Sequence, residues 1–215
     1  SLRAGLSIIA DPWFWIAAVP AVLLMGLSKS GFLTGFGSLA TPLMALAIPV
    51  PQAAAIMLPL LLVMDATGIR ALWKERDREL LRLILPAGLL GIGVGTLLFG
   101  VVSVKTVSAV LGAITLLFLL HRAFYKPPVD ARPLGRGAGF GLSVAAGFTS
   151  FVAHAGSPPV AAYVLPMKLA PIRFAATMAV FFGAINLAKW APYAFLGLLD
   201  ATNLATSALL LPLGP

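Results

Sequence analysis

Residues 26–42 read GLSKSGFLTGFGSLATP, and residues 147–159 read GFTSFVAHAGSPP. Both stretches place glycines, hydroxyl side chains and proline inside long apolar sequence. Such helix-breaking sequence is costly in lipid, because the hydrocarbon offers no hydrogen-bond partners to freed backbone N–H and C=O groups. It is tolerated where the chain lines a site that protein encloses or water fills. Two such breaks in corresponding halves of a chain predict a transporter built from repeats, with its substrate held between broken helices.

The composition indicates a polytopic membrane protein. Of 215 residues, 60% are hydrophobic and 10% are charged, and the mean hydropathy is +1.01. A soluble domain of this length could not bury so much apolar surface. The formal charge of +8 could suggest nucleic acid or an anion as a partner, but basic residues gathered in short loops are typical of positive-inside topology. We therefore expect membrane lipid as a partner and no nucleic acid.

Apolar segments follow one another along the chain. They cover residues 12–28, 38–49, 51–70, 83–102, 104–121, 137–153, 158–167 and 171–191, and then run from 204 to the end. The segments 38–49 and 158–167 are too short to cross a bilayer, which takes about 20 residues. We therefore expect these two segments to be short helices that enter the membrane without spanning it.

The basic residues predict the orientation. Residues 70–82 and 122–136 together hold nine lysines and arginines. An apolar hairpin that turns at residues 103–105 joins the two stretches, so both should lie on the same side. The lysine and arginine count places that side in the cytoplasm. The protein is thus expected in the cytoplasmic membrane, with Lys105 and residues 189–202 facing outward.

The two halves overlay with an offset of 119 residues, the spacing from Gly37 to Gly156. Each half then reads as a broken span, a short helix, a proline-marked turn and a long helix. The same offset places Arg70 on Lys189, which are expected on opposite sides of the membrane. The fold class is therefore predicted to be all-α, a polytopic membrane protein with two inverted repeats and broken, re-entrant half-helices.

The repeat predicts the domain organisation. We expect the first repeat over residues 1–122, a cytoplasmic loop over residues 123–136 and the second repeat over residues 137–215. The phrase LILPAG at residues 83–88 recurs as LLLPLG at residues 209–214. In the first half this phrase leads into further spans, so the second repeat is expected to be cut short by about one and a half spans.

The short helices are expected to begin near Ser38 and Ser157, where serine can cap a helix and proline suits the first turn. Free N–H groups and the positive dipole end at a helix N-terminus favour an anion. The alternative is that the glycines only allow close helix packing, as Gly91-x-x-x-Gly95 would. Hydroxyl side chains favour the anion site because packing does not need their donors: Ser30, Thr34, Ser38, Thr41, Thr149, Ser150 and Ser157.

Five further polar side chains lie in or beside the apolar spans. Lys29 borders the first break and Lys189 ends the long helix of the second half, and each could face the site or snorkel to the interface. His154 could donate to the substrate, carry a coupling proton because histidine titrates near neutral pH, or bond a helix carbonyl as a neutral ring. Asp65 could pair with a lysine or exchange a proton during transport. Asn186 is a neutral donor suited to a sulfonate or carboxylate oxygen.

Signatures of enzymes and of metal sites are weak. The GFGSLA stretch at residues 35–40 matches a relaxed dinucleotide fingerprint, but no βαβ unit surrounds it. Ser157 has no G-x-S-x-G context. His121 and His154 have no neighbouring cluster of carboxylates, and the chain has no cysteine. We therefore predict no enzymatic activity, no catalytic residue, no cofactor and no metal.

Two stretches carry a family resemblance. GFGSLATPLMALAIPVPQA at residues 35–53, followed by GFTSFVAHAGSPPVAAYVL at residues 147–165, resembles the TauE/SafE family of membrane proteins, also called the 4-toluene sulfonate uptake permease family. The resemblance runs from about residue 26 to residue 215. It implies a secondary carrier with two inverted halves for sulfur-containing anions such as sulfite, sulfoacetate or other organosulfonates. Both export and uptake are attributed to the group.

The chain departs from the family at one feature. Where a glycine triplet is common in the family, this chain has GSL at residues 37–39 and GSP at residues 156–158. This departure leaves the exact anion open.

We predict a secondary transporter for a small anion, most simply sulfite or a sulfonate. An anion channel of the same fold, a transporter of small carboxylates and an assembly factor without transport are the alternatives. A homo-oligomer is compatible with the sequence. The predicted substrate-binding residues are Lys29, Ser30, Thr34, Gly37, Ser38, Thr41, Ser150, His154, Gly156, Ser157 and Asn186, and the coupling candidates are Asp65, His154 and Lys189.

Overall fold

The computed structural model describes residues 8–29, 36–124 and 132–213. Within these ranges every regular element is helical. The elements are α1 (Pro12–Lys29), η1 (Phe36–Leu39), α2 (Ala40–Met44), α3 (Val50–Leu72), η2 (Trp73–Glu75), α4 (Arg78–Phe99), α5 (Val104–Phe124), α6 (Arg136–Ala153), α7 (Ser157–Val164), η3 (Leu165–Met167), α8 (Pro171–Phe195), α9 (Ala201–Leu210) and η4 (Leu211–Leu213). The elements labelled η are 3₁₀ turns.

Five of the described helices are long and apolar enough to cross a membrane. They are α1, α3 with η2, α4, most of α5, and α8. Helix α6 is as long as α1, but four glycines and three hydroxyl residues lower its hydropathy. The prediction of an all-α, polytopic membrane protein is confirmed.

Both predicted short segments are short helices in the structure. The segment predicted at 38–49 consists of η1 and α2, and it ends earlier than expected, at Met44. The segment predicted at 158–167 consists of α7 and η3. Helix α6 ends at Ala153, because His154 adopts a left-handed conformation with φ of 56°. The chain then restarts as α7, whose prolines stand in the first turn, where a missing N–H costs nothing.

Serine does not cap either short helix, so that prediction is wrong. The N-cap residues are Leu39 for α2 and Gly156 for α7, and neither makes a side-chain cap hydrogen bond. Ser38 lies inside η1, and Ser157 is the first residue of α7. A side-chain cap needs an extended backbone at the N-cap, whereas Leu39 and Gly156 both have helical backbone angles.

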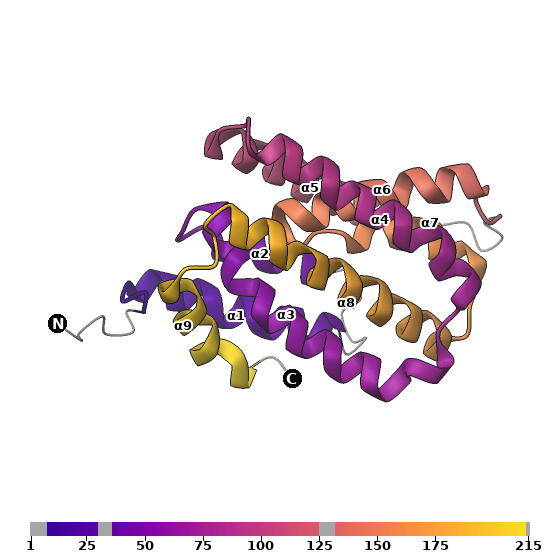
Figure 1. Cartoon of the computed structure of the whole chain (residues 1–215), viewed down its shortest axis with the longest axis horizontal. Helices are drawn as coiled ribbons and strands as arrows, with labels where there is room; N and C mark the ends of the chain where they lie inside the picture. Colours follow the sequence, from indigo (N-terminus) through magenta and orange to yellow (C-terminus); the bar gives the residue numbers. More distant parts are fainter. Residues whose placement is uncertain (1–7, 30–35, 125–131, 214–215) are drawn as a thin grey trace.

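Helices α4 and α6 pack with their backbones in contact (Figure 1). A Cβ atom added to Gly91 would overlap the carbonyl oxygen of Val144 in α6, and one added to Gly147 would overlap the carbonyl oxygen of Gly88 in α4. A Cβ atom on Gly95 would lie 2.7 Å from the Phe151 ring. The predicted packing role of the Gly91-x-x-x-Gly95 pair is therefore confirmed.

Helix α3 joins two parts of the apolar core. Its Ala55 and Leu58 pack with residues of α4, α6, α7 and α8. Its Ile56 and Leu60 pack with residues of α1, α2 and α9. These pairs follow helical periodicity onto different faces of α3. Figure 1 shows α3 and α8 running alongside each other through the middle of the molecule, with α9 beside α3.

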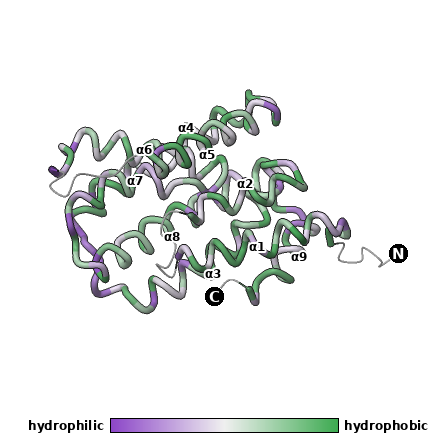
Figure 2. The backbone as a smooth tube through the Cα atoms, turned by 180° about the vertical axis from the view of Figure 1, so that it is seen from behind, coloured by the Kyte–Doolittle hydropathy of each residue, from purple (hydrophilic) through white to green (hydrophobic). Residues whose placement is uncertain are grey.

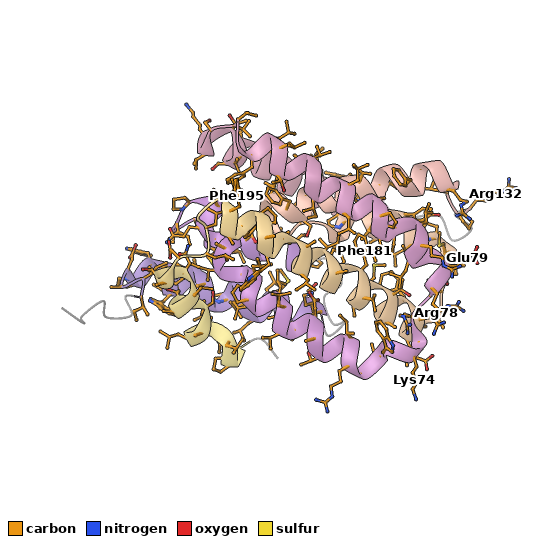
Figure 3. All side chains as sticks on the ribbon, in the orientation of Figure 1. Lys74, Arg78, Glu79, Arg132, Phe181 and Phe195 are labelled. Atoms are coloured by element: carbon orange, nitrogen blue, oxygen red, sulfur yellow. The ribbon has the colours of Figure 1, made fainter. Side chains whose placement is uncertain are left out.

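Hydrophilic residues gather at one end of the molecule. Apolar colour dominates the helices in Figure 2, while the connection between α3 and α4 is hydrophilic. Figure 3 places Lys74, Arg78, Glu79 and Arg132 at the same end, far from Phe195. The Nη1 atom of Arg136, at the start of α6, lies 4.0 Å from the Oε1 atom of Glu79. The described parts of the two basic stretches thus share one end, and their cytoplasmic location remains a prediction.

The order of elements recurs along the chain. A long helix, a short helix with a 3₁₀ turn and a second long helix occur as α1 to α3 and again as α6 to α8. The domain boundaries at residues 122 and 137, and the inversion of one half relative to the other, stay predictions.

Candidate functional site

The first polar group of the site joins three helices. Lys29, the last residue of α1, forms an ion pair with Asp65 of α3 through Oδ1. Asn186 of α8 donates to the other carboxylate oxygen of Asp65 at 2.5 Å. Asp65 is 3% exposed and the Lys29 side chain 23% exposed. Of the two roles considered for Asp65, the structure shows the pairing with a lysine.

The second polar group lies between α8 and the end of α6. The Nζ atom of Lys189 donates to the carbonyl oxygen and to the Oγ atom of Ser150, both at 3.0 Å, and lies 2.5 Å from His154 Nδ1. The Nε2 atom of His154 lies 2.7 Å from the carbonyl oxygen of Ala54. A carbonyl oxygen only accepts, so Nε2 carries the hydrogen and Nδ1 is the acceptor for Lys189.

Lys189 does not snorkel, and its expected outward position is wrong. The side chain is fully buried. Helix α8 continues beyond it to Phe195, so Lys189 does not end the helix. The corresponding residue of the first half, Arg70, is exposed. The overlay therefore matched two basic residues in different environments, one buried among polar partners and one at the surface.

One face of α8 carries most of the site. Phe182, Asn186, Lys189 and Tyr193 follow one another at helical spacing, which places them on the same side. The Nζ atom of Lys29 lies 5.8 Å from the centre of the Phe182 ring. Tyr193 donates to the carbonyl oxygen of Phe151 at 2.6 Å, and its ring centre lies 6.2 Å from that of His154.

Phe182, Tyr193 and the carbonyl group of Ala54 are not among the predicted site residues. The spacing of the two aromatic residues from Asn186 and Lys189 is a signal that could have identified them. Ala54 offers no side-chain signal. Pro59, five residues further along α3, lacks an N–H and so leaves the carbonyl oxygen of Ala55, next to Ala54, without its usual partner. Side chains bond carbonyls in this turn, with Ser207 donating to Ile56 at 2.6 Å.

The N-terminus of α7 lies beside both polar groups. A Cβ atom on Gly156 would lie 2.9 Å from Ser150 Cβ and 3.0 Å from the Phe182 ring. Ser150 binds Lys189, and Phe182 lies under Lys29. The bare backbone of Gly156 therefore packs against one neighbour of each lysine. A side chain at this position would push the α7 N-terminus away from them.

The first break packs against the end of α1. A Cβ atom on Gly37 would lie 2.8 Å from Met25 Sδ and 3.0 Å from Ser28, the residue before Lys29. The 3₁₀ turn η1 also contacts α7. Thr41, in α2, is fully buried, and its Oγ1 atom finds no hydrogen-bond partner in the part of the chain that the structure describes.

The remaining candidates are placed as follows. Ser38 is buried in η1, and Ser157 is half-buried at the start of α7. Thr149 donates to the carbonyl oxygen of Ala145 at 2.9 Å, so its own helix uses its donor. Ser30 and Thr34 lie outside the described residues. The structure thus brings together Lys29, Asp65, Ser150, His154, Gly156, Asn186 and Lys189.

The comparison with protein families gives one match. The family described as sulfite exporter TauE/SafE matches residues 18–214, from the middle of α1 to the residue after η4. The curated proteins and the solved structures give no significant match. The family match covers nearly the whole chain and confirms the resemblance seen in the sequence.

Proposed function

We propose that this chain, which belongs to the sulfite exporter TauE/SafE family, is a secondary carrier that moves sulfite or an organosulfonate across the cytoplasmic membrane. Membership of a transporter family and five membrane-length helices establish the broad class. The observation that carries the finer proposal is the fully buried Lys189, whose hydrogen-bond partners are neutral and which lies beside the N-terminus of α7.

The charges of this cluster favour an anion. Lys29 and Asp65 neutralise each other. Lys189 is bonded to a carbonyl, a hydroxyl and an imidazole nitrogen, none of which carries a negative charge. A buried ammonium group without a counter-ion costs several kcal/mol, even after the protein relaxes around it. A small anion held next to Lys189 would offset that cost.

The N-terminus of α7 supplies hydrogen-bond donors at the same place. Pro158 and Pro159 have no N–H, so the free donors of the first turn gather at Gly156 and Ser157. The hydroxyl group of Ser157 adds another donor, and the helix dipole favours negative charge at this end. A sulfonate or sulfite has three oxygens for these donors and Lys189, whereas a carboxylate has two.

A binding measurement tests this site. Ser157→Leu and Ser38→Leu should each weaken binding of sulfite and methanesulfonate to the purified protein by about ten- to a hundred-fold. A hydrogen bond to a charged ligand is worth about 1.5–3 kcal/mol, and a bulky side chain adds occlusion. Ser108→Leu is the control, because Ser108 is exposed on α5 and donates within its own helix.

Calorimetry in detergent measures the affinity, and size exclusion checks that each variant is folded. Wild-type affinity in both Ser157→Leu and Ser38→Leu would place the anion site elsewhere and leave the breaks as packing devices. Tighter binding of acetate than of methanesulfonate would favour a transporter of small carboxylates. If none of these anions binds, an assembly factor without transport would be favoured.

Flux into proteoliposomes separates the carrier from the channel. A carrier must rearrange once for each anion, so we expect uptake of sulfite to saturate with concentration. Linear flux that does not saturate would favour an anion channel of the same fold.

A further inference from the structure

We infer that the Lys189–His154 pair takes up one proton for each anion that binds, so that the carrier moves its anion together with a proton. This inference rests on the proposed function. It adds a proton to the proposed anion site, where Lys189 and His154 are buried in contact with each other.

The surroundings of Lys189 define which groups can hold this proton. His154 faces it from the end of α6, and Tyr193 lies one turn further along α8. Asn186, one turn earlier in α8, bonds Asp65 of α3, which is paired with Lys29 of α1. The other elements packed against α8 keep their charges at their ends. In α4 and η2 these are Lys74, Glu75, Arg78, Glu79 and Arg82, and α7 has no lysine, arginine, histidine or carboxylate.

Asp65 already has two partners of its own. One of its oxygens accepts from Lys29 and the other from Asn186. The Nδ2 group of Asn186 can only donate, as can an ammonium group. Both donors favour the ionised carboxylate, because each of its oxygens accepts a hydrogen bond. Asp65 is therefore the counter-ion of Lys29, and the Lys189–His154 pair is the proton site that the inference assigns.

The Lys189–His154 pair can exist in two protonation states on the same framework. As an ammonium group, Lys189 donates its three hydrogens to the Ser150 carbonyl oxygen, Ser150 Oγ and His154 Nδ1. As an amine, it keeps two of these donor bonds, and its lone pair accepts from the Ser150 hydroxyl, which can rotate. The proton joins the amine nitrogen from water when the anion arrives and returns to water when the anion leaves.

Charge balance links the two events. The Lys29–Asp65 pair is neutral, so the protonated cluster carries one net positive charge when no anion is present. Burial of that charge is costly, and an adjacent monoanion removes the cost. Each ligand therefore strengthens the binding of the other by the same factor. With the anion and the proton both bound, the cluster is neutral. A neutral site can change the side of the membrane to which it opens without moving a net charge.

Calorimetry in two buffers measures how many protons the protein takes up for each anion that it binds. Methanesulfonate is the probe because it stays a monoanion near neutral pH, whereas sulfite itself titrates. Its binding heat is measured at several pH values in phosphate and in Tris, which differ in ionisation enthalpy. We expect wild-type protein to take up a proton on binding, with uptake that rises toward one per anion as the pH increases. Binding without proton uptake at every pH would overturn the inference.

Two variants assign the proton to its site. Lys189→Arg keeps the positive charge but cannot lose its proton, so it should bind methanesulfonate with no proton uptake. Lys105→Arg is the matched control, because Lys105 is exposed on α5, and it should keep the wild-type uptake. Full uptake in Lys189→Arg would place the proton elsewhere and overturn the inference.

The wild-type measurement needs no variant, so it decides the inference even if Lys189→Arg does not fold. Failure of the wild-type protein to bind both methanesulfonate and sulfite would overturn the proposed function and this inference with it. Binding without uptake overturns only the inference.

Discussion

Lys29 and Lys189 occupy different environments, although both interrupt apolar sequence. Lys29 stands at the end of α1, has a carboxylate partner and is 23% exposed. Lys189 lies within α8, has neutral partners and is fully buried. The first environment lets the ammonium group keep part of its hydration, and the second does not. The two residues should therefore respond differently to substitution and to the presence of an anion.

The stability of the protein should fall more when the lysine of the ion pair is replaced than when the carboxylate is replaced. Lys29→Met leaves the Asp65 carboxylate buried with Asn186 as its remaining partner, and removing one member of a buried pair costs about 3–5 kcal/mol. Asp65→Asn leaves Lys29, which reaches water and lies near the Phe182 ring, so it should cost less. Thermal unfolding in detergent measures both effects.

The double variant Lys29→Met with Asp65→Asn is the control, since it removes both charges. It should be more stable than Lys29→Met alone, giving a favourable coupling in the double-mutant cycle. A larger loss of stability in Asp65→Asn than in Lys29→Met would show that the burial of the two side chains does not govern their energetics.

The sequence identifies the candidate polar side chains, but it does not show which of them are in contact. Asp65 and Asn186 stand out as polar residues in apolar helices. Their contact joins residues 121 positions apart, and periodicity shows which face of a helix is polar without showing which face of another helix it meets. The Ala54 carbonyl group cannot be identified from the sequence, because every residue has a backbone carbonyl.

At the scale of the elements, composition and proline positions predicted the helices well. Span lengths and the short segments followed from the number of apolar residues that a bilayer requires. The start of α7 at Ser157 followed as well, but its capping did not, because the cap depends on backbone angles at Gly156 that the residue type leaves free. The fully buried position of Lys189 also depends on how far α8 extends beyond it.

The contact between α4 and α6 should tolerate no side chain at Gly91. Gly91→Ala would place a Cβ atom against the backbone of α6, and backbone cannot move aside as a flexible side chain can. Overpacking of this kind costs about 1–3 kcal/mol or more. Gly93→Ala is the matched control two residues along the same helix, where a Cβ atom meets nothing within 4 Å.

Gly93→Ala should be neutral or slightly stabilising, because alanine favours a helix over glycine by up to about 1 kcal/mol. Thermal unfolding and the yield of monodisperse protein compare the two variants. Equal stability of Gly91→Ala and Gly93→Ala would mean that α4 and α6 are not in backbone contact.

At the scale of the whole molecule, the charged residues of the basic stretches should face the cytoplasm. Figure 3 places Lys74 and Arg132 at the same end of the molecule, and basic residues in short loops stay on the cytoplasmic side. The chain has no cysteine, so single cysteines give an unambiguous signal. An impermeant thiol reagent added to intact cells should label Val101→Cys but neither Lys74→Cys nor Arg132→Cys.

Val101 is 81% exposed in the turn between α4 and α5, at the other end of the α4 hairpin, so it serves as the outward control. Labelling of all three variants after the membrane is opened shows that each cysteine is accessible. Labelling of Lys74→Cys from outside, with Val101→Cys protected, would show that the protein has the opposite orientation.

The central claim is that an anion binds where the N-terminus of α7 meets Lys189, and a structure with a heavy-atom analogue tests it most directly. Selenite has the shape and charge of sulfite, and its selenium atom can be located by anomalous scattering. We predict an anomalous peak beside Gly156 and Ser157, within hydrogen-bonding reach of Lys189. Selenite that binds in solution but gives a peak only at the basic residues of the α3–α4 connection would contradict the account.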